Sequence, residues 1–152
     1  MTDTNAPGRH PVTLADVTEA AAALGGVVVR TPLLENPDVN EHLGGRLLIK
    51  AECAQRTGAF KIRGAYNCIR QLTAQQRARG AITYSSGNHA LGVGQAARLL
   101  GASVLIIMPG DVPPAKMAAV RQLGCDIETF DRDTENSDAV VERLRAETGR
   151  LI

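Results

Sequence analysis

The chain has 152 residues, of which 44% are hydrophobic and 22% charged, and its 17 basic residues nearly balance its 16 acidic ones. This composition indicates a soluble globular protein, and the interspersed charges leave neither a basic stripe for nucleic acid nor a polybasic patch for a membrane. Residues 1–11 are polar, no apolar run could span a membrane, and we therefore expect a cytoplasmic protein without nucleic-acid or membrane partners.

The N-terminal part of the chain mixes helical and extended patterns. Residues 1–12 are expected to form a disordered tail, and a helix is predicted from Thr13 to Leu24, because Thr13 and Asp16 have the spacing of a capping box. The β-branched run from Val27 to Val29 predicts a strand.

Extended chain is then expected through residues 31–33. A short helix is predicted from Asp38 to Leu43, ended by Gly44 and Gly45, and a strand from Arg46 to Ala51.

A single lysine follows a glycine turn and lies between two apolar neighbours. Lys61 stands between Phe60 and Ile62, at the start of a helical pattern that runs to about Leu72. A cation in the first helical turn opposes the helix dipole at a cost of roughly 0.3 to 1 kcal/mol, and partial burial would favour the neutral amine. A neutral amine is a nucleophile that forms a Schiff base with a carbonyl. The alternative is a surface lysine whose stem covers apolar neighbours.

A second motif, Ser85-Ser86-Gly87-Asn88-His89, follows the predicted strand 81–84 and opens an alanine-rich helix that ends at Gly101. A polar loop between a strand and a helix directs free backbone N–H groups and the positive end of the helix dipole at one point, which suits a carboxylate or a phosphate. The alternative is purely local capping, since Ser and Asn cap helices for their own sake.

Strands and helices alternate in the rest of the chain. After a short helix at 74–79, strands are predicted at residues 81–84, 103–108 and 126–130, each followed by a helix. This alternation indicates βαβ units and a parallel sheet, in which ligands bind at the carboxyl ends of the strands. The cysteines and histidines show neither a disulfide framework nor metal-ligand spacing; they are Cys53, Cys68, Cys125, His10, His42 and His89.

Together the two motifs resemble the fold-type II pyridoxal-phosphate enzymes, in the branch of threonine and serine dehydratases and serine racemases. In that family a Ser-Phe-Lys-x-Arg-Gly-Ala segment carries the lysine that holds the cofactor, and here residues 59–65 read AFKIRGA. The family's Ser-Ser-Gly-Asn-His loop is residues 85–89, and the next strand, loop and helix match through Met108-Pro109 and Lys116-Met117. Two positions depart from the family pattern: Ala59 replaces a serine and Leu91 a glutamine.

The resemblance implies a role for each matched residue. Lys61 would hold pyridoxal phosphate and take the Cα proton of the substrate, with Phe60 packed close to the cofactor. Asn88 would hydrogen-bond the cofactor's ring oxygen, and the backbone N–H groups of the loop would hold the substrate carboxylate; these loop residues are Ser85, Ser86, Gly87, Asn88 and His89. The implied reaction is the conversion of threonine or serine to a 2-oxo acid and ammonia. Ser86 also matches the acid/base position of the racemase branch, so amino-acid racemisation is the alternative.

The resemblance also implies a three-layer α/β fold with a parallel sheet, and a homo-oligomeric full-length enzyme. Residues 13–62 would belong to a large cofactor-binding domain, residues 63–149 to a small domain, and residues 150–152 to the return toward the large domain. The family's glycine-rich phosphate loop has no counterpart in these 152 residues, which predicts an N-terminal fragment. A non-catalytic fragment or binding module is therefore a further alternative. The isolated chain is expected to be unstable or to self-associate through Val27–Val29 and Leu47–Ile49, since unpaired apolar edges invite pairing. A nucleotide-binding module is disfavoured, because the glycines after residue 86 do not fit GxGxxG.

Overall fold

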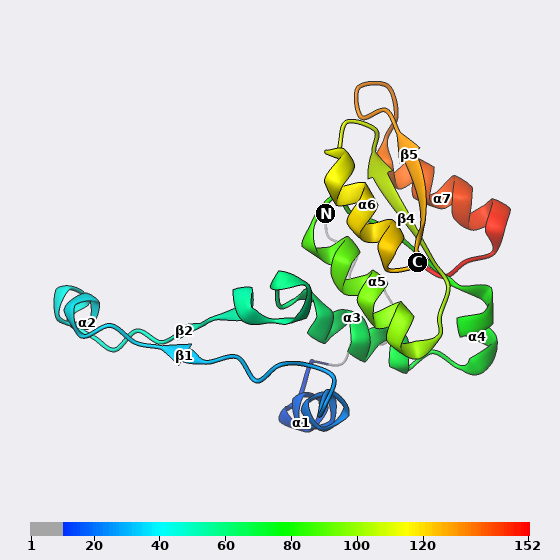
Figure 1. The fold of residues 1–152 in the computed structure, drawn as a ribbon. Coiled ribbons are helices and arrows are strands. Elements are labelled where there is room, and N and C mark those ends of the chain that lie inside the picture. Colours follow the sequence, from blue (N-terminus) through cyan, green and yellow to red (C-terminus); the bar gives the residue numbers. More distant parts are fainter. Residues whose placement is uncertain (1–10) are drawn as a thin grey trace.

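The computed structural model describes residues 11–152, so most of the tail predicted over residues 1–12 lies outside the described part (Figure 1). The helices and strands are α1 (Leu14–Ala23), β1 (Leu33–Leu34), α2 (Pro37–Leu43), β2 (Ile49–Lys50), the two short 3₁₀ segments η1 (Glu52–Ala54) and η2 (Arg56–Gly58), α3 (Lys61–Arg70), α4 (Ala74–Arg79), β3 (Ala81–Tyr84), α5 (Asn88–Leu100), β4 (Val104–Pro109), α6 (Pro114–Gln122), β5 (Asp126–Phe130) and α7 (Ser137–Thr148). None of the described helices combines the length and the apolar character needed to cross a membrane.

The main sheet has three parallel strands in the order β3-β4-β5, which confirms the parallel sheet predicted from the sequence. In register, Ala81 of β3 pairs with Val104 of β4, and Leu105 of β4 pairs with Asp126 of β5. Leu151 forms a parallel bridge with Ala81 on the outer side of β3, with its carbonyl accepting the N–H of Ile82 at 2.7 Å. The carboxyl ends of all three strands therefore lie along one edge.

The central strand β4 separates two hydrophobic clusters. Every residue of β4 is buried, and alternate side chains face opposite sides of a strand. Ile106 and Met108 join a cluster with residues of α3, α5 and α6, whereas Leu105 and Ile107 join a cluster with Val140 and other residues of α7. Figure 1 shows α5 and α6 on one side of the sheet and α7 on the other, so the expected three-layer arrangement is confirmed.

An arm projects from this layered unit. Figure 1 shows the β1–β2 ribbon leading away from α3, with α2 at its tip. The ribbon is antiparallel, with Leu34 opposite Ile49, and both of these side chains are more than half exposed. An ion pair between Arg46 and Glu35 links the two sides of the arm at 2.7 Å. The predicted strand 46–51 is thus reduced to Ile49–Lys50.

The strand predicted at Val27–Val29 is wrong, because this segment is a turn after α1. The N–H groups of Val27 and Val28 donate to the carbonyl of Leu24 at 3.0 and 3.2 Å. The backbone of Val29 pairs with the side chain of Gln55, which accepts from the N–H at 2.9 Å and donates to the carbonyl at 2.8 Å. Because a glutamine side chain satisfies both groups, this residue needs no partner strand.

Helix ends follow the predicted signals. Thr13 and Asp16 form the capping box of α1 with both of its hydrogen bonds, and α4 begins at a second capping box. The helices α2, α5 and α7 end at glycines with positive φ, where the left-handed conformation costs glycine least. The domain boundary expected between residues 62 and 63 falls inside α3.

Candidate active site

Lys61 is the first residue of α3 and lies at the end of a tight turn. Thr57, with φ of 66°, is the one non-glycine residue with positive φ among residues 11–152, and Gly58 follows with φ of 70°. The Thr57 hydroxyl is buried without a hydrogen-bond partner in the described part of the chain. A left-handed conformation outside glycine costs of order 1 to 3 kcal/mol, so the turn that places Lys61 is held by its surroundings.

The neighbours of Lys61 differ from each other in exposure. Ile62 is fully buried in the core, whereas Phe60 is 58% exposed. The Lys61 Nζ lies 5.3 Å from the centroid of the Phe60 ring, which is within the range of a cation–π contact. The amine therefore lies over one aromatic face, half-buried, at the surface of the layered unit.

Gly92 of α5 brings that helix against the lysine. A Cβ atom at position 92 would lie 2.9 Å from both the carbonyl carbon and the Cβ of Lys61, and 3.0 Å from the nitrogen of Ile62. Such distances are shorter than real carbon contacts, so only glycine permits this approach of the two helices. No local pattern in the sequence indicates this role, because the glycine lies mid-helix and its partner is 31 positions away in the sequence.

Arg63, two residues further along α3, ties the lysine helix to the start of the arm. Its guanidinium binds both carboxylate oxygens of Glu52, at 2.7 and 2.9 Å, and Glu52 also accepts from the Thr31 hydroxyl at 2.6 Å. Lys50 donates to the Thr31 carbonyl at 2.6 Å. The hydrogen bonds from Arg63 are the main cause that lowers the pKa of Glu52 from 4.5 to about 2. Bidentate pairs of this kind fix orientation as well as charge.

The loop between β3 and α5 is organised by Ser85. The Ser85 Oγ accepts from the N–H groups of Gly87 at 3.2 Å and Ala90 at 3.1 Å, and its own N–H donates to the Ile107 carbonyl at 3.0 Å. The hydroxyl oxygen of Ser85 therefore accepts two hydrogen bonds, one from the loop and one from the first turn of α5.

Three backbone N–H groups of the same loop stay available. No hydrogen bond within residues 11–152 engages the N–H groups of Ser86, Asn88 or His89. Asn88 and His89 open α5, a helix of 13 residues, so the dipole adds positive potential at this point. The arrangement suits an anion, as the sequence pattern predicted.

The side chain of His89 connects the loop to the lysine electrostatically. Its Nε2 lies 3.3 Å from the Thr83 hydroxyl, and the ring is partly buried. Burial lowers the pKa of the imidazole, and the positive charge of Lys61 lowers it further. The charge on Lys61 thus acts on a residue of the loop, although Lys61 and His89 are 28 positions apart in sequence.

A small cavity of about 70 Å³ opens beside the loop. Ser86, Gly87 and Asn88 line one side, and Lys116 from the first turn of α6 lines another. Lys61 and Phe60 do not line this cavity. No role for Lys116 follows from the sequence pattern alone, although a cation in a first helical turn opposes the helix dipole.

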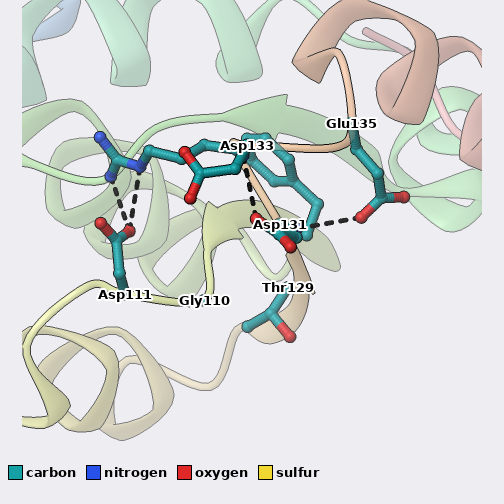
Figure 2. Close-up of a pocket in the computed structure, with 8 residues that line it drawn as sticks. Gly110, Asp111, Thr129, Asp131, Asp133 and Glu135 are labelled. Atoms are coloured by element: carbon teal, nitrogen blue, oxygen red, sulfur yellow. Dashed lines mark hydrogen bonds and ion pairs between the residues drawn. The ribbon is translucent and has the colours of Figure 1, made fainter.

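A larger cavity of about 440 Å³ lies past the carboxyl ends of β4 and β5 and contains none of the predicted site residues. Figure 2 shows its carboxylates, with Asp111 held by Arg132 at 2.7 Å and the Glu135 carboxylate accepting from the N–H of Asp131 at 2.9 Å. Its excess of acidic groups disfavours an anionic ligand.

Within residues 11–152, His, Cys, Asp and Glu side chains form no group of three or more suited to a metal ion.

Taken together, these residues form the parts of a site for a carbonyl compound with an anionic group. Lys61 supplies an amine over an aromatic face, and amines react with carbonyls. The loop after β3 supplies unpaired N–H donors at a helix N-terminus. Gly92 and the Glu52–Arg63 pair fix the helix that carries the amine.

Comparison with known proteins gives a consistent result. L-threo-3-hydroxyaspartate ammonia-lyase of Pseudomonas sp is 41% identical over 137 residues, which are 90% of this chain and 43% of that protein. Serine racemase of Oryza sativa subsp. indica is 38% identical over 136 residues, which are 90% of this chain and 40% of that protein. The chain thus spans about two fifths of the length of these relatives.

Solved structures show the same fold. Maize serine racemase superposes with a TM-score of 0.84 at 37% identity, over 93% of this chain and 43% of that one. The processed form of threonine deaminase isoform 2 from Solanum lycopersicum gives a TM-score of 0.78 at 32% identity, over 90% of this chain and 40% of that one. These likenesses confirm the fold-type II architecture expected from the two motifs. The sequence signature described as "Pyridoxal-phosphate dependent enzyme" matches residues 25–152, and the chain belongs to that family.

Proposed function

We propose that this chain supplies the lysine and the carboxylate-binding loop of a pyridoxal-phosphate-dependent ammonia-lyase, which converts a β-hydroxy amino acid to a 2-oxo acid and ammonia. The observation that carries the proposal is the packing together of the two helices that begin at the motifs, since Gly92 brings α5 against the backbone of Lys61 in α3. The relatives include ammonia-lyases named for L-threonine and for L-threo-3-hydroxyaspartate. Threonine, serine and 3-hydroxyaspartate are therefore the candidate substrates.

Each residue has a task in this proposal. Pyridoxal phosphate, when bound, supplies the electron sink for cleavage of a bond at Cα. The Lys61 Nζ would hold the cofactor and accept the Cα proton of the substrate, and the side-chain amide of Asn88 would donate to the cofactor's ring oxygen. Phe60 would shield one side of the amine, because its ring lies 5.3 Å from the Nζ. The free N–H groups of Ser86, Asn88 and His89 bind the substrate carboxylate, while Ser85 holds the loop in shape.

Racemisation is the second candidate, and the Ser86 side chain favours it. Ser86 lines the small cavity, and no hydrogen bond in the described residues occupies its hydroxyl. A racemase needs such a group to deliver a proton to the face opposite Lys61. Substitution of Ser86 by alanine separates the two candidate activities: lyase turnover survives it, whereas racemisation is lost.

The proposed function also includes the cytoplasmic location and the homo-oligomeric state that were predicted from the sequence.

The cofactor assignment has a direct test in this chain. The purified protein is mixed with pyridoxal phosphate and reduced with borohydride, and modified residues are located by peptide mass, with Lys61→Ala as the control. Labelling confined to Lys61 supports the proposal. Equal labelling of many lysines, or none, would contradict it and favour a non-catalytic binding module. Release of a 2-oxo acid against formation of the D-amino acid then separates lyase from racemase.

A further inference from the structure

Thr57 combines two unfavourable features in the turn that leads to Lys61. Its backbone has φ of 66° and ψ of 11°, a left-handed conformation that glycine and asparagine adopt far more readily than a β-branched residue does. Its hydroxyl oxygen is buried without a hydrogen-bond partner, and it is the single side-chain atom of this kind within residues 11–152. An unpartnered buried hydroxyl reduces stability, because it has given up its hydrogen bonds to water.

The polar groups next to Thr57 along the chain are already engaged. The side chain of Gln55 donates to the carbonyl of Val29 at 2.8 Å and accepts from the N–H groups of Val29 and Arg56, both at 2.9 Å. The carbonyl of Gln55 accepts from the N–H of Gly58 at 2.8 Å, which closes the turn. The turn therefore keeps its shape without using the Thr57 hydroxyl.

The stability of the turn does not account for a threonine at this position. Glycine would adopt the same backbone conformation at lower cost and would leave no hydroxyl to bury. Strained residues of this kind cluster at functional sites, where the strain is part of the mechanism. Thr57 stands four residues before Lys61, and its segment η2 contacts α5, the helix that begins at Asn88. The turn thus adjoins both helices of the proposed site.

We propose that the Thr57 hydroxyl is a contact to the pyridoxal phosphate that Lys61 holds. The phosphate and ring oxygens of this cofactor accept hydrogen bonds, and a threonine hydroxyl donates one. The cofactor then supplies the partner that the chain itself does not. This inference rests on the proposed function, because Lys61 must hold the cofactor.

Rotation of one side-chain bond makes the hydroxyl available. Thr57 as a residue is only partly buried, although its hydroxyl oxygen is buried, so other atoms of the residue carry its exposed surface. Rotation about the Cα–Cβ bond moves the hydroxyl from its buried position into another staggered rotamer. The hydroxyl thereby exchanges an unpartnered position for a hydrogen bond when the cofactor is bound.

The variant Thr57→Val tests the inference before any cofactor is added. Valine keeps the β-branched shape and the backbone strain while removing the hydroxyl, so the midpoint of thermal unfolding should rise by about 2 to 4 °C. Thr31→Val is the matched control, because the Thr31 hydroxyl donates to Glu52 at 2.6 Å and its loss should lower the midpoint. A lower midpoint for Thr57→Val would show that the hydroxyl has a partner within the chain, and it would overturn the inference.

Cofactor binding should change in the opposite direction. The dissociation constant for pyridoxal phosphate is measured by absorbance titration of each variant, with Lys61→Ala as the background. Thr57→Val should bind about fivefold more weakly than the native sequence, which is the typical effect of one hydrogen bond, whereas Thr57→Ser should stay within about twofold. Equal affinities of Thr57→Val and the native sequence would contradict the proposed contact.

The rotamer of Thr57 gives a readout that does not depend on affinity. NMR couplings to its methyl carbon report the torsion about Cα–Cβ, and this torsion should change when pyridoxal phosphate is added. If Lys61 is labelled while the torsion stays unchanged, this inference alone is wrong. If borohydride trapping gives no specific label at Lys61 in the native sequence, the proposed function fails and this inference fails with it.

Discussion

Gly92 of α5 lies so close to Lys61 of α3 that a single added carbon atom would be 2.9 Å from the lysine's own Cβ. The contact involves backbone and Cβ atoms, which cannot swing aside as a long side chain can. The position of the reactive amine therefore depends on the absence of a side chain on another helix.

Substitution Gly92→Ala should consequently displace α3. We expect a loss of about 1 to 3 kcal/mol in the free energy of unfolding, typical of an overpacked core. Labelling of Lys61 by pyridoxal phosphate should slow as well. Urea denaturation and timed borohydride trapping measure the two effects.

Gly64→Ala is the matched control on α3 itself. No atom lies within 4 Å of a Cβ placed there, and the residue is helical. Alanine should stabilise the chain by about 0.5 to 1 kcal/mol, through the lower conformational entropy of its unfolded state. A stable, normally labelled Gly92→Ala variant would contradict the close-packing argument.

The two serines of the loop should respond differently to alanine. Ser85→Ala removes the acceptor for the N–H groups of Gly87 and Ala90 and should cost about 0.5 to 2 kcal/mol, as loss of a helix cap does. Ser86→Ala removes a hydroxyl with no partner in residues 11–152 and should change stability by less than about 0.5 kcal/mol. Thermal unfolding of both variants checks this, and equal losses would show that the division of roles is wrong.

Glu52→Gln should destabilise the chain in a pH-dependent way. The carboxylate is largely buried against Arg63 and its pKa is about 2, below the ordinary 4.5. A lowered carboxyl pKa stabilises the fold above the ordinary value, and this contribution is lost as the pH falls from 4.5 toward about 2. We expect a cost of about 1 to 3 kcal/mol at neutral pH, allowing for partial exposure.

Urea titrations of Glu52→Gln at neutral and acidic pH provide the measurement. The stability difference from the native sequence should narrow as the pH is lowered below 4.5. Glu19→Gln is the control, because its pair with Arg70 is mostly exposed on the glutamate side and should contribute little. If the stability difference between Glu52→Gln and the native sequence stayed constant with pH, the Glu52–Arg63 ion pair would not be its cause.

The ring of His89 should titrate below its ordinary pKa of 6.5, chiefly because of burial. The unfolded chain then binds the proton more readily, so this ring reduces stability as the pH falls through 6.5. Removing the charge with Lys61→Met should raise the pKa of His89 while leaving it below 6.5, since the burial remains. NMR titration of the ring resonances measures both. An unchanged pKa of His89 in Lys61→Met would show that the charge of Lys61 does not act on the ring of His89.

The arm should drive self-association at high concentration. Leu33, Leu34 and Ile49 are 59%, 52% and 56% exposed, and both edges of the two-stranded ribbon lack a further strand in residues 11–152. Exposed apolar edges of this kind pair with other chains. Leu34→Lys should shift the chain toward the monomer in sedimentation experiments, and unchanged association would point to another surface.

Local sequence determined much of this protein. Nearly all helices were predicted from capping residues such as Thr13 and from glycine stops such as Gly101. The parallel sheet was predicted from apolar strands that alternate with helices. These signals act over a few residues, so they can be read in the sequence itself. The two motifs around Lys61 and Ser86 predicted the family and the cofactor.

Only the tertiary structure decided how these parts meet. Val27–Val29 has strand-forming residues, yet the side chain of Gln55 satisfies the backbone of Val29 from 26 positions away. The approach of Gly92 to Lys61 and the place of Lys116 beside Ser86 likewise depend on helices packing together on one face of the sheet. Local pattern in the sequence could identify the reactive groups. The distances between those groups were set by packing, and they could not be predicted, because contacts between distant residues leave no periodicity in the sequence.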